Sequence, residues 1–381
     1  MVAAVAGSPA AAFDPASCLR LVVKIGSSLL VDTGGAVKRD WLAGVVADIA
    51  ARRAAGQQIV IVSSGAIALG ARRLGLEKGG RASLEDAQAA AAVGQVALAG
   101  VWEALLAAQG LTAAQVLLTL GDLEDRRRYL NVAATIARLL DLGAVPVLNE
   151  NDTVATTEIR FGDNDRLAAR AGQAAGASGV ILLSDVDGLY TANPATDPEA
   201  RRLPVVDALT PEVMAMATGE TRSGMGSGGM AAKLLAARMA GAAGIALAIC
   251  DGRVERPLTH FATAGGGTLF LPPRAAKGRK AWLAGRITVA GTLTVDAGAA
   301  AALKRGASLL AAGVRSVEGR FRRGDVVALH GPDGALLGRG LAGYDADDAR
   351  AIQGLRNEAQ AAVLGYAPRA ALVHADHLVL I

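Results

Sequence analysis

Six short apolar runs recur along the first two thirds of this 381-residue chain, and each has the length and the Val, Ile and Leu content of a buried β-strand. Stretches with apolar residues at helical spacing separate most of them, for example residues 39–56. Because the runs are apolar throughout, both faces of the sheet must be covered by helices. The sequence therefore predicts an α/β fold, a three-layer sandwich with a mainly parallel central sheet. The predicted strands are residues 19–25, 58–63, 114–120, 144–149, 179–184 and 244–250.

The chain divides into regions of different character. Residues 1–17 are Ala-rich, without a positive start or a sustained apolar core, and predict a disordered tail rather than a signal peptide. Residues 18–265 carry the strand and helix alternation and predict the first domain. Residues 266–284 combine Gly, Pro and basic side chains and predict a linker. Residues 285–381 alternate in short runs between glycine turns, which predicts a small β-rich barrel or sandwich.

Composition narrows the class of protein. A hydrophobic content of 52% is enough for a large core, and a net charge of +4 is small for this length and does not indicate a nucleic-acid partner. Two cysteines without metal-ligand spacing fit a reducing compartment. The Ala-rich run 87–108 is interrupted by Gly94, Gln95 and Glu103, so no membrane span is expected and a cytoplasmic location is predicted.

Polar residues follow the predicted strands, where ligands bind in parallel α/β sheets. Lys24 stands near the end of the first run, and burying a lysine is costly unless it meets an anion. A structural ion pair is the alternative explanation. Gly26 and the amides of Ser27 and Ser28 would let a phosphate approach the backbone. Ser64 follows the second run and can cap a helix, contact a ligand, or do both.

A serine hydrolase is disfavoured by two observations. No G-x-S-x-G pattern surrounds Ser64, and all four histidines lie at position 260 or later, away from the predicted strand ends.

The segment ENDTVATTEIRFGDNDRLAA, residues 150–169, is the most acidic part of the chain. Carboxylates this dense repel one another unless positive charge sits among them. A metal site, an acid–base pair and a solvated loop are all compatible with composition alone. The middle of the segment, residues 154–161, alternates like a hairpin, and GDND begins a helical pattern. Five acidic residues contribute to the cluster: Glu150, Asp152, Glu158, Asp163 and Asp165.

The stretch SGMGSGGMAAK, residues 223–233, is the most Gly-rich. It matches G-x-G-x-x-G only formally, because no strand precedes it, and a flexible linker is the plain alternative. It opens a helical pattern, however, whose free N–H groups suit a phosphate that Lys233 could also reach. Ser184 and Asp185 stand at the end of another predicted strand, and Asp185 and Asp187 either cap or turn the chain or hold one edge of a nucleotide or metal.

Taken together, five motifs resemble the amino acid kinase family, and within it the branch that phosphorylates the side-chain carboxylate of L-glutamate in proline biosynthesis. The matching pieces are VVKIGSS, IVIVSSGAIALG, VPVLNENDTVATTEIRFGDND, LLSDVDGLYTANP and GMGSGGMAAK. The C-terminal region resembles the PUA domain. The resemblance implies the amino acid kinase sandwich, followed by a PUA-like barrel.

The resemblance also implies roles for individual residues. Lys24 and Lys233 would stabilise the transferring phosphoryl group, and Asp165 would orient both lysines. Glutamate would be bound by Ser64, Asp152 and Asn164. No residue is assigned as a metal ligand, although Mg²⁺ is expected to accompany ATP. The ATP-binding positions would be Lys24, Ser184, Asp185, Ser227, Gly228, Gly229, Met230, Ala231, Ala232 and Lys233. The alanines at 231 and 232 replace hydroxyl residues usual in the family, which could weaken nucleotide contacts.

Elementary chemistry agrees with this reading. A glutamate side chain, with a pKa of about 4.3, is already ionised at neutral pH and needs no general base. The reaction needs positive charge on the phosphoryl group and alignment of two anions. Asp152 offers a partner for the substrate ammonium, which an N-acetylated substrate lacks. Alternatives remain: an acetylglutamate, aspartate, carbamate or nucleoside monophosphate kinase on the same fold, or an RNA-binding PUA protein with a degenerate kinase domain.

Further partners are implied by the resemblance alone. They are proline as a feedback inhibitor overlapping the glutamate site, a homodimer or homotetramer, and hand-over of the product to glutamyl phosphate reductase. RNA binding has weak support, since residues 284–381 carry 11 Lys or Arg against 9 Asp or Glu.

Overall fold

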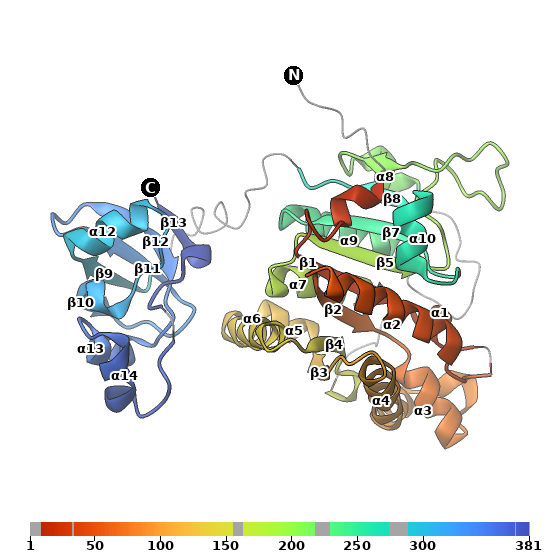
Figure 1. Cartoon of the computed structure of the whole chain (residues 1–381), viewed down its shortest axis with the longest axis horizontal. Coiled ribbons are helices and arrows are strands. Elements are labelled where there is room, and N and C mark those ends of the chain that lie inside the picture. Colours follow the sequence, from red (N-terminus) through yellow and green to blue (C-terminus); the bar gives the residue numbers. More distant parts are fainter. Residues whose placement is uncertain are drawn as a thin grey trace. The chain divides into compact units, whose positions relative to one another are not determined.

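The computed structural model describes residues 9–32, 34–154, 163–217, 229–273, 289–369 and 371–380. The chain separates into two compact units, Met1–Pro273 and Arg274–Ile381, and each unit has its own sheet (Figure 1).

Eight strands form the sheet of the first unit, in the order β3-β4-β2-β1-β5-β7-β8-β6. Neighbours pair in parallel, except that β8 runs antiparallel to β7. The predicted α/β class is confirmed, and all six predicted strands are present to within two residues at each end. The strands are β1 (Arg20–Ile25), β2 (Gln58–Ser63), β3 (Ala113–Leu118), β4 (Val145–Glu150), β5 (Gly179–Ser184), β6 (Val205–Val206), β7 (Ala246–Asp251) and β8 (Thr268–Phe270).

Helices cover both faces of this sheet, because each central strand is apolar on both sides. Leu21, Val23 and Ile25 of β1 enter one hydrophobic cluster, whereas Val22 enters a second cluster on the opposite face. The helices of the unit are α1 (Ser27–Leu30), α2 (Arg39–Ala54), α3 (Ala66–Leu74), α4 (Leu84–Ala107), α5 (Leu120–Glu124), α6 (Arg126–Asp141), α7 (Asp163–Ala175), α8 (Pro211–Ala215), α9 (Met230–Ala242) and α10 (Pro257–Ala264), with short 3₁₀ turns at η1 (Pro9–Phe13), η2 (Glu77–Gly80) and η3 (Asp152–Val154).

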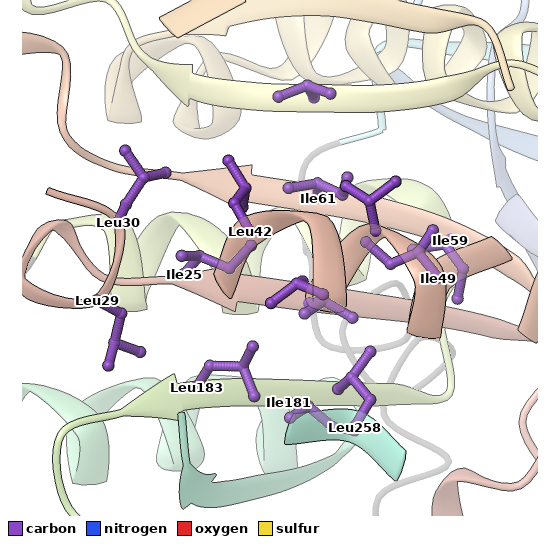
Figure 2. Close-up of a cluster of buried hydrophobic side chains, with 14 of the residues drawn as sticks. Ile25, Leu29, Leu30, Leu42, Ile49, Ile59, Ile61, Ile181, Leu183 and Leu258 are labelled. Atoms are coloured by element: carbon purple, nitrogen blue, oxygen red, sulfur yellow. The ribbon is translucent and has the colours of Figure 1, made fainter. Parts of the chain in front are cut away.

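Different helices supply the two clusters. The first cluster receives side chains from α2, α4 and α10, and the second from α6, α7 and α9. Figure 2 shows part of the first cluster, where Leu42 and Ile49 of α2 lie beside Ile25, Ile61 and Ile181 of three adjacent strands. The packed sheet is therefore a rigid scaffold, and the loops at its strand ends can hold binding and catalytic residues.

Helix α4 differs from the sequence prediction. It is long and apolar enough, by length and composition alone, to cross a membrane, so the expectation that its polar residues and glycine break up such a span is wrong. Those residues stay inside one helix, because isolated glycines such as Gly94 and Gly100 weaken a helix without ending it. Trp102 of α4 is 1% exposed and donates its indole N–H to Ser63 Oγ at 2.9 Å. Part of α4 thus serves as a core helix of the first unit.

The N-terminal region is ordered from Pro9, so the predicted disordered tail is wrong for residues 9–17. Phe13 is fully buried, and its ring lies 6.0 Å from that of Phe261. Arg52 and Gln57 donate hydrogen bonds to the Phe13 carbonyl at 2.9 and 3.0 Å. Burial of the Phe13 side chain, together with these hydrogen bonds, offsets the conformational entropy that is lost when residues 9–17 become ordered.

The predicted linker also begins too early. Residues Thr268–Phe270 form β8, which pairs with β7 and is buried along its whole length. Its three residues are too few to show a strand pattern between glycines and prolines in the sequence.

The second unit has a five-stranded sheet in the order β10-β9-β11-β12-β13. Its pairings are antiparallel except for β9 with β11, and it has a separate hydrophobic core, which confirms the predicted small β-rich module. The elements are β9 (Gly291–Val295), α12 (Ala297–Lys304), η4 (Ala311–Gly313), β10 (Val314–Gly319), β11 (Val326–His330), β12 (Leu336–Leu341), α13 (Ala346–Ile352), α14 (Asn357–Leu364), η5 (Ala375–His377) and β13 (Leu378–Leu380).

Candidate active site

The carboxyl ends of the central strands bring the predicted site residues to one edge of the first unit's sheet. Ile25 of β1 lies opposite Ser63 of β2 and Leu183 of β5 in the parallel register. The residues that follow, Gly26, Ser64 and Ser184, therefore lie at the same level, as the sequence predicted: Gly26 and Ser64 come just after β1 and β2, and Ser184 is the last residue of β5.

Asp165 is the centre of the site. Its Oδ1 lies 2.6 Å from Nζ of Lys24, and its Oδ2 lies 3.2 Å from Nζ of Lys233. The Asp165 side chain is fully buried, and the two lysine side chains are 9% and 8% exposed. Lys24 comes from β1, Asp165 from the first turn of α7 and Lys233 from the first turn of α9. The structure thus brings together three residues that are up to 209 positions apart.

This cluster carries one net positive charge, because two ammonium groups share one carboxylate. Burial lowers the pKa of Lys24, and Lys233 adds to that effect while Asp165 opposes it. Burial alone would raise the pKa of Asp165, but Lys24 and Lys233 hold it below its usual value. Buried charge of one sign is costly, so the cluster is arranged to receive an anion.

Backbone glycines leave room for such an anion. Gly26 and Gly229 are the N-caps of α1 and α9, and neither helix start has a side-chain cap bond. A Cβ at Gly26 would lie 3.6 Å from Nζ of Lys24, in ordinary contact with it, so a side chain there would occupy space beside the ammonium group. The start of α9 adds partial positive charge next to Lys233.

Asn164 joins two strand ends on the other side of Asp165. Its Nδ2 donates to Ser64 Oγ at 2.6 Å and to Asn149 Oδ1 at 3.2 Å. Its Oδ1 is buried without a hydrogen-bond partner among the residues that the structure describes. Asn149, the next-to-last residue of β4, is 3% exposed and was not singled out from the sequence. Only the strand register places it beside Asn164.

Asp152 lies in η3, just after β4, and is 9% exposed. Arg81, which precedes α4, is close enough that the charge of Asp152 raises its pKa, although burial lowers the pKa of Arg81 more strongly. Arg81 is thus a second charged residue at this end of the site, and sequence reasoning did not find it because it belongs to no recognised motif.

Ser184 and Asp185 occupy the end of β5. Ser184 is 4% exposed and donates to Asp185 Oδ1 at 3.2 Å. Gly252, which follows β7, donates its N–H to the Ser184 carbonyl at 2.7 Å. A Cβ at Gly252 would lie 2.3 Å from the end of the Leu29 side chain and 3.2 Å from the Ser184 backbone nitrogen, so a larger residue there would require Leu29 to shift.

Asp187 has structural partners. It accepts from Tyr190 Oη at 3.0 Å and pairs with Arg202 at 3.0 Å. Of the two alternatives for Asp187, chain turning is favoured over holding a ligand.

A further charged pair lies at the end of β7. Arg253 donates two hydrogen bonds, of 2.9 and 2.7 Å, to the carboxylate of Asp251, and the sequence did not reveal this pair.

Some predicted positions lie outside the described residues. These are Ser227, Gly228 and Glu158, together with the side chain of Asp163 and the hairpin pattern of 154–161. Gly229, Met230, Ala231 and Ala232 lead into or begin α9, as predicted. Within the described part of the chain there is no group of three or more His, Cys, Asp or Glu side chains that could hold a metal ion.

A buried cationic cluster at the carboxyl edge of a parallel α/β sheet is the arrangement expected of an enzyme that transfers a phosphoryl group. The chain belongs to the amino acid kinase family, whose model matches residues 19–251, and the PUA domain model matches residues 291–363.

Curated relatives are similar along nearly the whole chain. A glutamate 5-kinase of Sphingopyxis alaskensis is 64% identical over 97% of this chain and 99% of its own length. Those of Novosphingobium aromaticivorans and Zymomonas mobilis are 62% and 58% identical, over 96% and 99% of this chain and 97% and 95% of their own lengths. A solved structure of isopentenyl phosphate kinase overlaps with a TM-score of 0.44 at 20% identity, covering 66% of this chain and 99% of that one, a likeness too weak to add to the assignment.

Proposed function

We propose that this protein is an ATP-dependent kinase that converts L-glutamate to L-glutamyl 5-phosphate, the first step of proline biosynthesis. The observation that carries the proposal is the Lys24–Asp165–Lys233 cluster, with its net positive charge, in a chain 64% identical to the glutamate 5-kinase of Sphingopyxis alaskensis.

The reaction is a direct displacement at phosphorus. An oxygen of the glutamate side-chain carboxylate forms a bond to the γ-phosphorus of ATP, while the bond from that phosphorus to the β–γ bridging oxygen breaks and ADP leaves. No proton has to be removed, so a site without histidine is sufficient. Lys24 and Lys233 would neutralise the oxygens of the transferring group, and Asp165 would fix both ammonium groups in advance.

ATP and Mg²⁺ fit this site in different ways. The amides at the start of α9, with the cationic cluster beside them, suit the phosphates of ATP. Mg²⁺, when bound, would neutralise phosphate charge and align the phosphates. The described residues hold no cluster of metal ligands, so phosphate oxygens and water would supply most of its coordination.

Recognition of glutamate would depend on its ammonium group. Asp152 offers a nearly buried negative charge, and Asn164 Oδ1 is an acceptor that still lacks a donor among the described residues. Both favour a free amino acid over an N-acetylated one, whose amide carries no charge.

An assay of ADP release with a panel of acceptors tests the substrate assignment. We expect release with L-glutamate and little with N-acetylglutamate, aspartate, carbamate or nucleoside monophosphates. Release with one of these acceptors and none with glutamate would contradict the proposal, and no release with any of them would favour a degenerate kinase domain.

Replacing Asp152 by alanine should raise the KM for glutamate by about tenfold to a hundredfold, because a charged hydrogen-bond partner is lost. The KM for ATP should change less than about twofold, since the charges that act on Lys24 are those of Asp165, Lys233 and Asp185. Steady-state kinetics with each substrate varied in turn measures both values. Asp141→Ala, at the exposed end of α6, is the matched control. An unchanged KM for glutamate in the Asp152 variant would refute its role.

Proline would inhibit by occupying the same place, because it carries the same cation and α-carboxylate. Inhibition competitive with glutamate, and weakened by Asp152→Ala, is the expected pattern; inhibition unaffected by glutamate concentration would place proline elsewhere.

The product is a reactive acyl phosphate, so prompt transfer to glutamyl phosphate reductase in the cytoplasm is the expected next step, and channelling assays with that reductase would test it.

A homo-oligomer formed through α4 is the expected assembly. Val96 on this helix is 73% exposed, and only 39% of the helix's most apolar window is buried within the unit. Sedimentation of the protein and of a Val96→Lys variant would test this, since a monomeric wild-type protein contradicts it.

A further inference from the structure

A line of three amide side chains connects helix α4 to the candidate glutamate site. Gln95 of α4 accepts, through Oε1, a hydrogen bond from Asn149 Nδ2 at 2.8 Å. Asn149 Oδ1 accepts from Asn164 Nδ2 at 3.2 Å, and the same Nδ2 donates to Ser64 Oγ at 2.6 Å. Asn149 is almost completely buried, so both ends of its amide need protein partners.

The order of donors and acceptors along this line follows from the end of the amide that its first member presents. An amide has an acceptor oxygen at one end and a donor nitrogen at the other. Because Gln95 presents its oxygen, Asn149 turns its nitrogen toward α4 and its oxygen toward Asn164. Asn164 must then present its nitrogen to Asn149 and Ser64. Its oxygen is left pointing elsewhere, buried and without a donor among the described residues.

We propose that Gln95 is a positioning residue for glutamate: its carbonyl oxygen sets the orientation of Asn149 and thereby keeps Asn164 Oδ1 available to accept from the substrate ammonium. The inference rests on the proposed function, since it assumes an acceptor substrate with an ammonium group. It assigns a role to a residue on α4 that need not touch the substrate.

The three hydrogen-bonded amides of Gln95, Asn149 and Asn164 form a relay in which each donor faces the next acceptor. This fixed direction distinguishes the proposed role of Gln95 from a role in packing alone. A donor at position 95 would favour Asn149 with its oxygen toward α4 and its nitrogen toward Asn164. Asn164 would then accept from Asn149 and from the Ser64 hydroxyl, and would turn its N–H group toward the substrate cation. Ammonium binding would be lost even though every protein hydrogen bond is satisfied.

Three substitutions at Gln95 test this direction. Gln95→Glu keeps an acceptor, Gln95→Met keeps the size without a hydrogen bond, and Gln95→Lys supplies only a donor. We expect the KM for glutamate to stay within about threefold of wild type for Glu, to rise about tenfold for Met, and to rise further for Lys. The KM for ATP should stay within about twofold throughout. Gln109→Lys, at an exposed position just beyond α4, controls for added charge.

Thermal unfolding of each variant gives the second readout. The proposal is supported if the KM for glutamate follows the order Glu, Met, Lys without following the loss of Tm. It is overturned if Gln95→Met has the lowest KM for glutamate of the three variants, or if Gln95→Glu and Gln95→Lys raise this KM equally. It is also overturned if the KM for ATP rises in parallel with the KM for glutamate. Failure of the proposed function itself looks different, because the wild-type protein would then release ADP with another acceptor. If that acceptor carries an ammonium group, as aspartate does, the same three variants measured with it still decide the role of Gln95; if it carries none, the role of Gln95 is refuted together with the proposed function.

Discussion

Replacing Asp165 by asparagine should lower the free energy of unfolding of the first unit by about 3–5 kcal/mol and reduce kcat by about a hundredfold or more. Asparagine has the same shape but leaves Lys24 and Lys233 buried with no negative charge between them. In the wild-type protein the carboxylate lies 2.6 and 3.2 Å from the two ammonium groups and is itself fully buried. Breaking such a cluster strands two charges, whereas breaking a surface pair strands none.

The pH dependence of stability should follow the same residue. The lysines lower the pKa of Asp165 below its value of about 3.9 in an unfolded chain. Its stabilising contribution is therefore complete at neutral pH, and it is lost as the pH falls through the lowered pKa. Urea unfolding at neutral pH should thus show the full difference between wild type and Asp165→Asn, and the two should converge in strong acid.

Two companion variants separate stability from catalysis. Asp347→Asn breaks an exposed pair with Arg350 in the second unit and should cost less than about 1 kcal/mol. Adding Lys24→Met to Asp165→Asn removes one unpaired charge and should recover part of the lost stability while leaving the enzyme inactive. A stable Asp165→Asn protein, or a double variant no more stable than the single one, would contradict this account.

The sequence predicted the framework and the charged centre for local reasons. Each strand is a continuous apolar run, and Lys24 stands inside such a run, where its burial demands an explanation. Asp165 was predicted only through the resemblance and the density of acid around it. The structure adds the pairing of this one carboxylate with both lysines, which explains how Asp165 is tolerated in a fully buried position.

Residues that act through tertiary contacts were not predictable in the same way. Gln95 and Asn149 are 54 positions apart and belong to a helix and a strand whose patterns say nothing of each other. Arg81 lies in a connection without a motif. Phe13 was assigned to a disordered Ala-rich tail because one large apolar side chain does not make a pattern. In each case the missing information was which distant element lies alongside, and local periodicity does not contain it.

The crossing of α3 and α4 shows how strongly such a contact can constrain the site. A Cβ at Gly94 would lie 1.7 Å from the carbonyl oxygen of Ala66, and one at Gly70 would lie 1.7 Å from that of Ala90. The two helix backbones therefore touch, and neither can move without the other. Ala66 is two residues after Ser64, and Gly94 directly precedes Gln95. The contact thus fixes the distance between both ends of the hydrogen-bonded line that holds Asn164.

Replacing Gly94 by alanine should accordingly destabilise the first unit by about 3 kcal/mol or more, because the helices must separate. Helix propensity alone predicts the opposite, a gain of about 1 kcal/mol, so the sign of the effect is decisive. Gly100→Ala is the matched control, since it lies in the same helix and a Cβ there meets nothing within 4 Å. We expect that control to be neutral or slightly stabilising in urea unfolding. Where Gly94→Ala protein folds, its KM for glutamate should rise while its KM for ATP changes little, because α4 carries Gln95 and α3 begins two residues after Ser64, whereas neither helix carries a lysine of the phosphoryl centre. Equal stability of the two alanine variants would mean that α3 and α4 do not touch, and would remove the basis for a fixed glutamate site.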